Sequence, residues 1–462
     1  MDPERFRPII RILFLLAIFL SNANSEALER KDAEQKTKYE MAFALFDLEG
    51  KRFVETHNEE SPLMPASTQK LILSAAALKS LGPEYRFRTE FFGHLSDNGT
   101  IPLLHVRGGH APDLTIEEIW KITRRLKEQG VRKISSIYLD ASRAPDPKPR
   151  SGMHAYEGPS GALSVNFNAV AFEICPANAG ERARISLNPP EADLEYVSSV
   201  KSIDTGELAS FQVKDMPCKR KTALQCVSLS GQIAVGTGCQ IDYVSVSSPT
   251  RYFEKLFTHL LRSNGIGVPS EAIEAVPDQK LPLLYSHVSK PLRQILDDLN
   301  HFSTNFIAEQ ILAALGEDVD GSMKRSRGLE RLLQYLESLG GSIQKVKLVD
   351  ASGLSKDNRL TAGILVRILS DMYHDSKIKP EFLNSLSING LSGTLKERNF
   401  GLSPGAFRGK TGTLDGVMAL AGYLEGKGGK IYALALIQNG FDNRERALAL
   451  ELEKVQEAVQ KE

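Results

Sequence analysis

The chain has 462 residues, more than a single hydrophobic core usually serves, so two or three domains are expected. It carries 57 basic and 57 acidic residues. This balance argues against nucleic acid and against an anionic membrane surface as partners.

The first 25 residues are predicted to be a signal peptide. Arginines within the first eleven residues precede or border the apolar stretch from Ile12 to Leu20, and small residues lead up to Ser25. The apolar stretch is short for a membrane span, and no second candidate span follows it. We therefore expect an exported protein with no membrane span in the mature chain, in the periplasm or else outside the cell or at its wall.

The first half of the chain is predicted to contain mostly strands, with two helices between them. Apolar alternation predicts strands at 41–47, 52–57, 86–92, 101–106 and 134–139. An apolar helix begins near Ser67, and a second helix ends at Gly130 after a capping box of Thr115 and Glu118. From 164 to 247 the chain is strand-rich, with candidates at 171–174, 183–187, 225–229 and 241–246.

Strong helical periodicity returns after Arg251. Helices are predicted over 292–299 and 306–315, strands over 409–413, 418–424 and 430–438, and a closing amphipathic helix over 443–459. The N-terminal part of the chain has two predicted strands and a helix, and the C-terminal part has three strands and a helix. This arrangement predicts one antiparallel sheet assembled from both ends of the chain. Residues 88–277 would then be an insertion.

Ser67 and Lys70 are the candidate nucleophile and base. Residues three apart share one face of a helix, so the lysine amine can reach the serine hydroxyl. A serine hydroxyl needs such a partner to react at neutral pH. S-x-x-K also occurs at Ser198 and Ser342, but only Ser67 precedes a long apolar helical run, whereas Ser342 precedes a strand-like stretch.

Two later motifs complete a set. Ser303 and Asn305 form S-x-N at a junction between predicted helices, and Lys410, Thr411, Gly412 and Thr413 enter a predicted strand. S-x-x-K, S-x-N and K-T-G in this order are typical of enzymes that form a penicilloyl-serine. S-x-N recurs elsewhere in the chain, whereas Lys410–Gly412 is the single K-T-G.

With these motifs, the chain resembles the D-alanyl-D-alanine carboxypeptidase/endopeptidase family of low-molecular-mass class C penicillin-binding proteins. The resemblance extends to Leu163–Asn168, Asp350–Ser355 and Gly393–Leu395, which by themselves are interpreted as structural segments. It also includes the separation of about 230 residues between Ser67 and Ser303. At Gly108–Leu114 the chain departs from the family pattern, because His110 and Ala111 replace its middle.

The resemblance implies an α+β fold: a transpeptidase domain like that of penicillin-binding proteins and serine β-lactamases, with nested, strand-rich inserted domains. The expected boundaries are 26–87 with 278–462 for the catalytic domain, 88–164 with 237–277 for a second domain, and 165–236 for a third. The implied substrates are peptidoglycan peptides, with β-lactam antibiotics as inhibitors. The balance between carboxypeptidase and endopeptidase action depends on how the inserted domains shape access.

The resemblance also implies a role for each site residue. Ser67 attacks the D-Ala-D-Ala carbonyl, Lys70 accepts the hydroxyl proton and Ser303 relays it to the leaving amine, while Asn305 holds Lys70 and the substrate amide. Lys410 and Thr411 bind the terminal carboxylate, and Gly412 allows a close approach to the strand. The backbone N–H groups of Ser67 and Thr413 form the oxyanion hole.

Cysteine and histidine spacing predicts no metal site and no cofactor. The four cysteines, Cys175, Cys218, Cys226 and Cys239, contain no C-x-x-C, and no histidine lies in H-E-x-x-H. Disulfides or buried free thiols are expected instead, and three pairings are possible.

Two other functions fit parts of the pattern. A serine β-lactamase shares the acylation chemistry, but the large insertion and the absence of a recognisable deacylation glutamate argue against it. A catalytically silent peptidoglycan-binding protein of the same fold is disfavoured because every reactive side chain is present.

Overall fold

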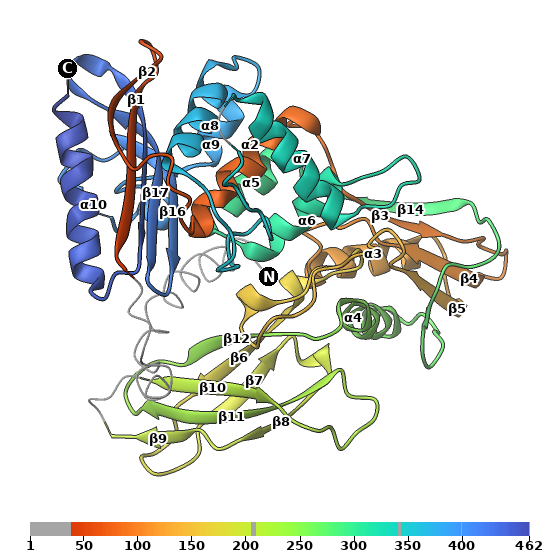
Figure 1. Ribbon diagram of the computed structural model, residues 1–462. Helices are drawn as coiled ribbons and strands as arrows, with labels where there is room; N and C mark the ends of the chain where they lie inside the picture. Colours follow the sequence, from red (N-terminus) through yellow and green to blue (C-terminus); the bar gives the residue numbers. More distant parts are fainter. Residues whose placement is uncertain (1–37, 205–208, 341–342, 399, 462) are drawn as a thin grey trace. The chain divides into compact units, whose positions relative to one another are not determined.

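The computed structural model describes residues 38–204, 209–340, 343–398 and 400–461 (Figure 1). The contacts of these residues define two compact units, one formed by residues 87–289 and the other by residues 38–86 together with 290–461. The predicted signal peptide lies outside the described residues. No helix in the described part is both long and apolar enough to cross a membrane.

The second unit is built on one antiparallel sheet with the strand order β15-β16-β17-β18-β1-β2. Its strands are β1 (Glu40–Asp47), β2 (Arg52–His57), β15 (Ser387–Ile388), β16 (Phe407–Leu414), β17 (Val417–Glu425) and β18 (Ile431–Asn439). Pairing of β1 with β18 joins the two ends of the chain in one sheet, as the sequence predicts. The predicted α+β fold class is confirmed.

Helices cover both faces of this sheet (Figure 1). One face carries α10 (Arg444–Val459), and the other carries α8 (Ala362–His374), against which α2 (Lys70–Ser80) packs. Around α2 pack α5 (Leu292–Phe302), α6 (Asn305–Leu315), α7 (Arg325–Ser338) and α9 (Lys379–Ser385). Every residue of α2 from Lys70 to Leu78 is buried, because helices or the sheet surround it on all sides. This central position explains its alanine- and leucine-rich sequence.

The first unit holds three further sheets. The largest has the order β13-β5-β4-β3-β14 and carries the packed pair α3 and α4, while the others have the orders β12-β6-β7 and β10-β11-β8, with β9 also paired to β11. Their elements are β3 (Arg88–Phe92), β4 (Thr100–Arg107), α3 (Ile116–Glu128), β5 (Lys133–Asp140), β6 (Ala169–Cys175), β7 (Arg184–Asn188), β8 (Leu194–Ser198), β9 (Lys201–Ile203), β10 (Ser210–Asp215), β11 (Gln225–Ala234), β12 (Gln240–Ser245), α4 (Pro249–Ser263), β13 (Ile273–Glu274) and β14 (Leu283–Val288).

The structure differs from the sequence predictions at three places. Thr115 precedes α3 but makes no side-chain cap; Asn166, fifty residues later, accepts the hydrogen bond from the Ile116 N–H instead. β14 lies in the segment assigned by sequence to the catalytic domain, yet it pairs with β3. The stretch from 343 to 350 forms only an isolated bridge at Lys347 rather than a strand, and Ser342 lies outside the described residues.

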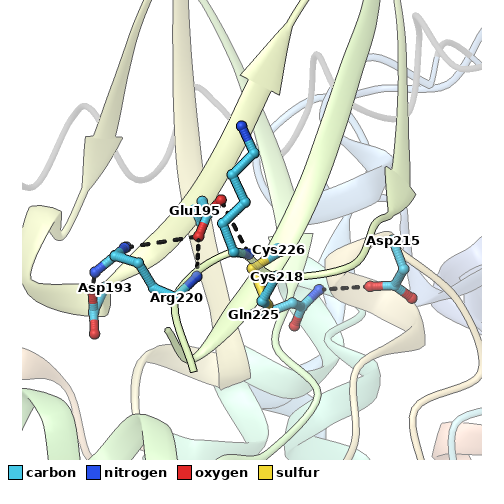
Figure 2. Close-up of a disulfide and its surroundings, with 8 residues drawn as sticks. Asp193, Glu195, Asp215, Cys218, Arg220, Gln225 and Cys226 are labelled. Carbon is cyan, nitrogen blue, oxygen red and sulfur yellow. Dashed lines mark hydrogen bonds and ion pairs between the residues drawn. A yellow bond between two sulfur atoms is a disulfide. The ribbon is translucent and has the colours of Figure 1, made fainter. Parts of the chain in front are cut away.

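Both disulfides lie in the strand-rich part of the first unit. Cys175 at the end of β6 bonds Cys239, which directly precedes the neighbouring strand β12. Cys218 bonds Cys226 on β11 (Figure 2). The structure thus selects one of the three possible pairings, and it leaves no free cysteine among the described residues.

The two disulfides differ in the length of chain that they close, which gives a matched pair of variants. The sequence separations are 64 residues for Cys175–Cys239 and 8 for Cys218–Cys226. The chain-entropy argument assigns about 4 kcal/mol to the longer loop and about 2.5 kcal/mol to the shorter one.

We predict that Cys175→Ser/Cys239→Ser lowers the unfolding midpoint of the first unit more than Cys218→Ser/Cys226→Ser does. Urea unfolding followed by near-ultraviolet circular dichroism measures both losses. An equal or reversed order would contradict the loop-length argument.

Candidate active site

Ser67 lies in a short 3-10 turn rather than in the α-helix that the sequence predicts. The turn η4 (Ala66–Gln69) leads directly into α2, whose first residue is Lys70. Residues three apart eclipse each other in a 3-10 turn, so Ser67 and Lys70 still share a face. Ala66 has a φ of 47°, a left-handed conformation that is costly for alanine and is maintained by the packing around it.

That packing comes from two glycines on opposite segments. A β-carbon added to Gly412 on β16 would lie 3.0 Å from the Ser67 nitrogen and 2.8 Å from the Pro65 carbonyl oxygen. A β-carbon on Gly353 would collide with the Ala66 backbone. Both positions therefore need glycine because the turn carrying Ser67 lies directly against their backbone.

Asn439, at the end of β18, fixes the segment that enters this turn. Its side chain accepts a hydrogen bond from the Met64 N–H at 2.8 Å and donates one to the Met64 carbonyl at 3.1 Å. The sequence motifs did not identify this residue, because Asn439 lies 372 positions beyond Ser67 and belongs to no motif.

The structure brings Ser67, Lys70 and Asn305 together. The Lys70 amine lies 2.9 Å from the Ser67 hydroxyl oxygen and 2.8 Å from the Asn305 side-chain oxygen. Lys70 is fully buried, whereas Ser67 is partly exposed. Ser67 is thus accessible to solvent while Lys70 is not.

Ser303 and Asn305 lie at a sharp break between helices. Ser303 ends α5 in a left-handed conformation, with φ 57° and ψ 35°, and Asn305 begins α6. This reversal directs Asn305 to Lys70. Within the described residues the Ser303 side chain has no hydrogen bond, so the structure does not join it to Lys70.

Lys410 on β16 is the second buried cation of the site. Its amine donates to the Thr411 carbonyl at 2.8 Å. Burial, and after it the charge of Lys70, holds the pKa of Lys410 well below its usual range. A substrate carboxylate beside Lys410 would favour the charged amine and raise that pKa.

The remaining K-T-G residues lie on one edge of β16. β15 pairs with Arg408 and Gly409 only, so beyond them no strand among the described residues covers this edge of β16. Thr413 is exposed there. An uncovered strand edge offers backbone hydrogen bonds to an extended peptide.

Gly393–Leu395, interpreted from sequence as structural, supports Thr411. This segment forms the turn η8, and the Thr411 hydroxyl donates to the Thr394 hydroxyl oxygen at 2.8 Å. The Thr394 N–H in turn donates to the Ser387 hydroxyl at 3.2 Å. Nearby, His301 on α5 makes a 3.2 Å contact with Ser392, and burial lowers the pKa of His301.

Asp350–Ser355, also interpreted as structural, contacts the base itself. The Ser352 carbonyl lies 2.5 Å from the Lys70 amine and accepts a hydrogen bond from it. Backbone acceptors carry no sequence signature, so the motifs do not predict this contact.

The described residues contain one cluster with the composition of a metal site: ligand atoms of Glu173, Cys175 and Cys239 lie within 4.8 Å of one another. Both sulfur atoms are bonded to each other, so neither is available as a thiolate ligand.

Comparison with known proteins agrees with this geometry. The model of a family described as "D-Ala-D-Ala carboxypeptidase 3 (S13) family" matches residues 25–456. A D-alanyl-D-alanine carboxypeptidase of Actinomadura sp. (strain R39) is 29% identical over 402 residues, which are 82% of this chain and 73% of that protein. Carboxypeptidase DacB of Mycolicibacterium smegmatis is 34% identical over 82% of this chain and 72% of its own length.

A solved structure shares the fold. Penicillin binding protein 4 (dacB) from Haemophilus influenzae superposes with a TM-score of 0.81 at 22% identity, covering 92% of this chain and 97% of that protein. The same protein has been solved in complex with a β-lactam.

We predict that Gly412→Ala lowers the rate of acylation by a β-lactam roughly a hundredfold, because the added carbon displaces the Ser67 turn and small misplacements of reacting groups are costly. Gly238→Ala is the control, since a β-carbon there meets nothing within 4 Å. Stopped-flow labelling with a fluorescent penicillin measures both rates. A normal rate in Gly412→Ala would show that the turn tolerates the shift.

Proposed function

Because this chain belongs to the D-Ala-D-Ala carboxypeptidase 3 (S13) family of serine-type peptidases, we propose that it removes the terminal D-alanine from peptidoglycan stem peptides through an acyl-enzyme on Ser67. The observation that carries the proposal is the 2.9 Å contact between the Ser67 hydroxyl and the buried Lys70 amine. The proposed inhibitors are β-lactams, and the proposed location is outside the cytoplasm, which follows from the predicted signal peptide.

In the first step, Ser67 attacks the carbonyl of the D-Ala-D-Ala bond while its proton passes to Lys70. Lys70 must be neutral to accept it. Complete burial disfavours the charged form of an amine, and a second cation close by does the same. Lys410 is that second cation once a substrate carboxylate lies beside it and favours its charged form.

The uncovered edge of β16 supplies the groups that bind substrate. Lys410 and Thr411 take the terminal carboxylate, and Thr394 holds the Thr411 hydroxyl in place. The N–H groups of Ser67 and Thr413 stabilise the oxyanion, a contribution of about 3 kcal/mol per donor in other acyl transfers.

Ser303 passes the proton to the leaving D-alanine amine, and Asn305 keeps Lys70 aligned during the transfer. Water then attacks the ester and regenerates Ser67. With a β-lactam the leaving group stays tethered to the acyl group, so the same attack leaves a covalent adduct.

We predict that Ser67→Ala abolishes both covalent penicillin labelling and release of D-alanine, because the variant lacks the hydroxyl that lies 2.9 Å from the Lys70 amine. Mass spectrometry of the intact protein checks the adduct, and circular dichroism checks the fold. Stoichiometric labelling of this variant would reject Ser67 as the nucleophile.

A second prediction separates a base from a mere charge partner. Lys70→Arg keeps the positive charge but cannot give a neutral base near pH 7, so acylation should fall by about 10²- to 10⁴-fold. Lys79→Arg, at an exposed end of α2, is the matched control. Near-native acylation of Lys70→Arg would mean that Lys70 acts only through its charge.

The β-lactamase alternative is tested with the wild-type protein. Release of D-alanine from a stem pentapeptide, together with a long-lived penicilloyl adduct, is expected. Rapid turnover of nitrocefin without release of D-alanine would favour the β-lactamase.

A further inference from the structure

Two of the groups that contact the Lys70 amine can only accept hydrogen bonds. One is the Asn305 side-chain oxygen at 2.8 Å, and the other is the Ser352 carbonyl at 2.5 Å. A neutral amine has two N–H donors and one lone pair. When these two acceptors take both N–H groups, the lone pair is left facing the Ser67 hydroxyl. The Ser352 carbonyl therefore determines which way the proton between Ser67 and Lys70 can move.

The orientation of this carbonyl is fixed from the other side of its own peptide unit. The Ser352 carbonyl and the Gly353 N–H belong to one planar trans peptide, so they point in opposite directions. The Gly353 N–H donates to the Asp350 carboxylate at 2.7 Å. While that hydrogen bond persists, the carbonyl must point towards Lys70.

Asp350 is itself held in place by two further donors. The Ser355 N–H donates to its second carboxylate oxygen at 2.7 Å, and the Asn358 side chain donates to the first at 3.1 Å. Asp350 is 5% exposed. The Asp350 carboxylate thus holds the loop from 350 to 358 in one conformation through hydrogen bonds from three of its residues.

The Asp350–Ala351 peptide unit ties this loop to the helices of the site. Gln69, one residue before Lys70, donates to the Asp350 carbonyl, and the Ala351 N–H donates to the Glu309 carboxylate at 3.0 Å. Arg325 forms an ion pair with Glu309 at 2.7 Å. These bonds prevent the loop from rotating as a whole.

We propose that Asp350 is a positioning residue for acylation: it holds the Ser352–Gly353 peptide unit so that the Ser352 carbonyl orients Lys70 as the base for Ser67. The proposal rests on the function proposed above. After proton transfer, the same carbonyl accepts from the Lys70 ammonium and stabilises the charge that forms. Asp350 does not touch the substrate in this mechanism.

Asp350→Asn tests the proposal because an amide offers an oxygen on one side only. Its NH₂ group would face either the Ser355 N–H or the Gly353 N–H, so the peptide unit can turn away from Lys70. Asp350→Glu keeps the charge but moves the carboxylate. Asp357→Asn removes an exposed charge from the same loop and is the control.

The measurement is the second-order rate constant of acylation by a fluorescent penicillin between pH 5 and 10, corrected for the fraction of enzyme that can be titrated. The charged groups on the elements around Lys70 are Lys410 on β16, Asp350 in its loop and Glu309 on α6, which accepts from the Ala351 N–H of that loop. His301 on α5, which interacts with Lys410, adds a charge when it is protonated. Losing the carbonyl removes an acceptor from the charged amine, which lowers the pKa of the base. The acid limb of the pH profile should therefore move to lower pH.

We expect both Asp350 variants to acylate at least tenfold more slowly with this shift, and Asp357→Asn to match the wild type. A shift of the acid limb in Asp350→Asn alone would reflect the lost charge and overturn the proposal, as would an unchanged acid limb in both variants.

If neither Asp350 variant folds, Asn358→Ser is the alternative, because it removes one donor to the same carboxylate. It should shift the acid limb by a smaller amount in the same direction, and an unchanged pH profile would overturn the proposal. A wild-type protein that forms no Ser67 adduct would instead overturn the proposed function.

Discussion

The confinement of the Lys70 amine is the constraint on which the rest of the site depends. A lysine amine with no exposed surface must be surrounded by acceptors, or its burial would destabilise the fold. Those acceptors come from the S-x-N junction and from the loop at Ser352. The same contacts that make burial tolerable also set the geometry of a base, so stability and catalysis use one set of hydrogen bonds.

Close packing of backbone extends this constraint to the nucleophile. The turn carrying Ser67 lies against Gly412 of the sheet and Gly353 of the loop, with no room for a side chain at either position. Asn439 then fixes the chain just before the turn. The strained conformation of Ala66 persists because these neighbours leave the chain no alternative.

Lys70 and Lys410 are two buried amines, and a charge on either one disfavours a charge on the other. Empty of substrate, the site disfavours a fully protonated pair, and the lowered pKa of Lys410 expresses this. In the proposed mechanism, a bound carboxylate favours the charged form of Lys410 and leaves Lys70 as the amine that accepts a proton. Substrate recognition and activation of the nucleophile are in this way electrostatically linked.

The sequence by itself determined the candidate site residues and the sheet built from both chain ends. Ordered motifs identify Ser67, Lys70, Asn305 and Lys410 because their chemistry requires particular residue types at fixed local spacings. The tertiary structure alone decided the Asn166 cap of α3, the disulfide pairing, the 3-10 turn at Ser67 and the Ser352 carbonyl beside Lys70. Each of these depends on backbone groups or on partners distant in sequence, and any residue type provides a carbonyl.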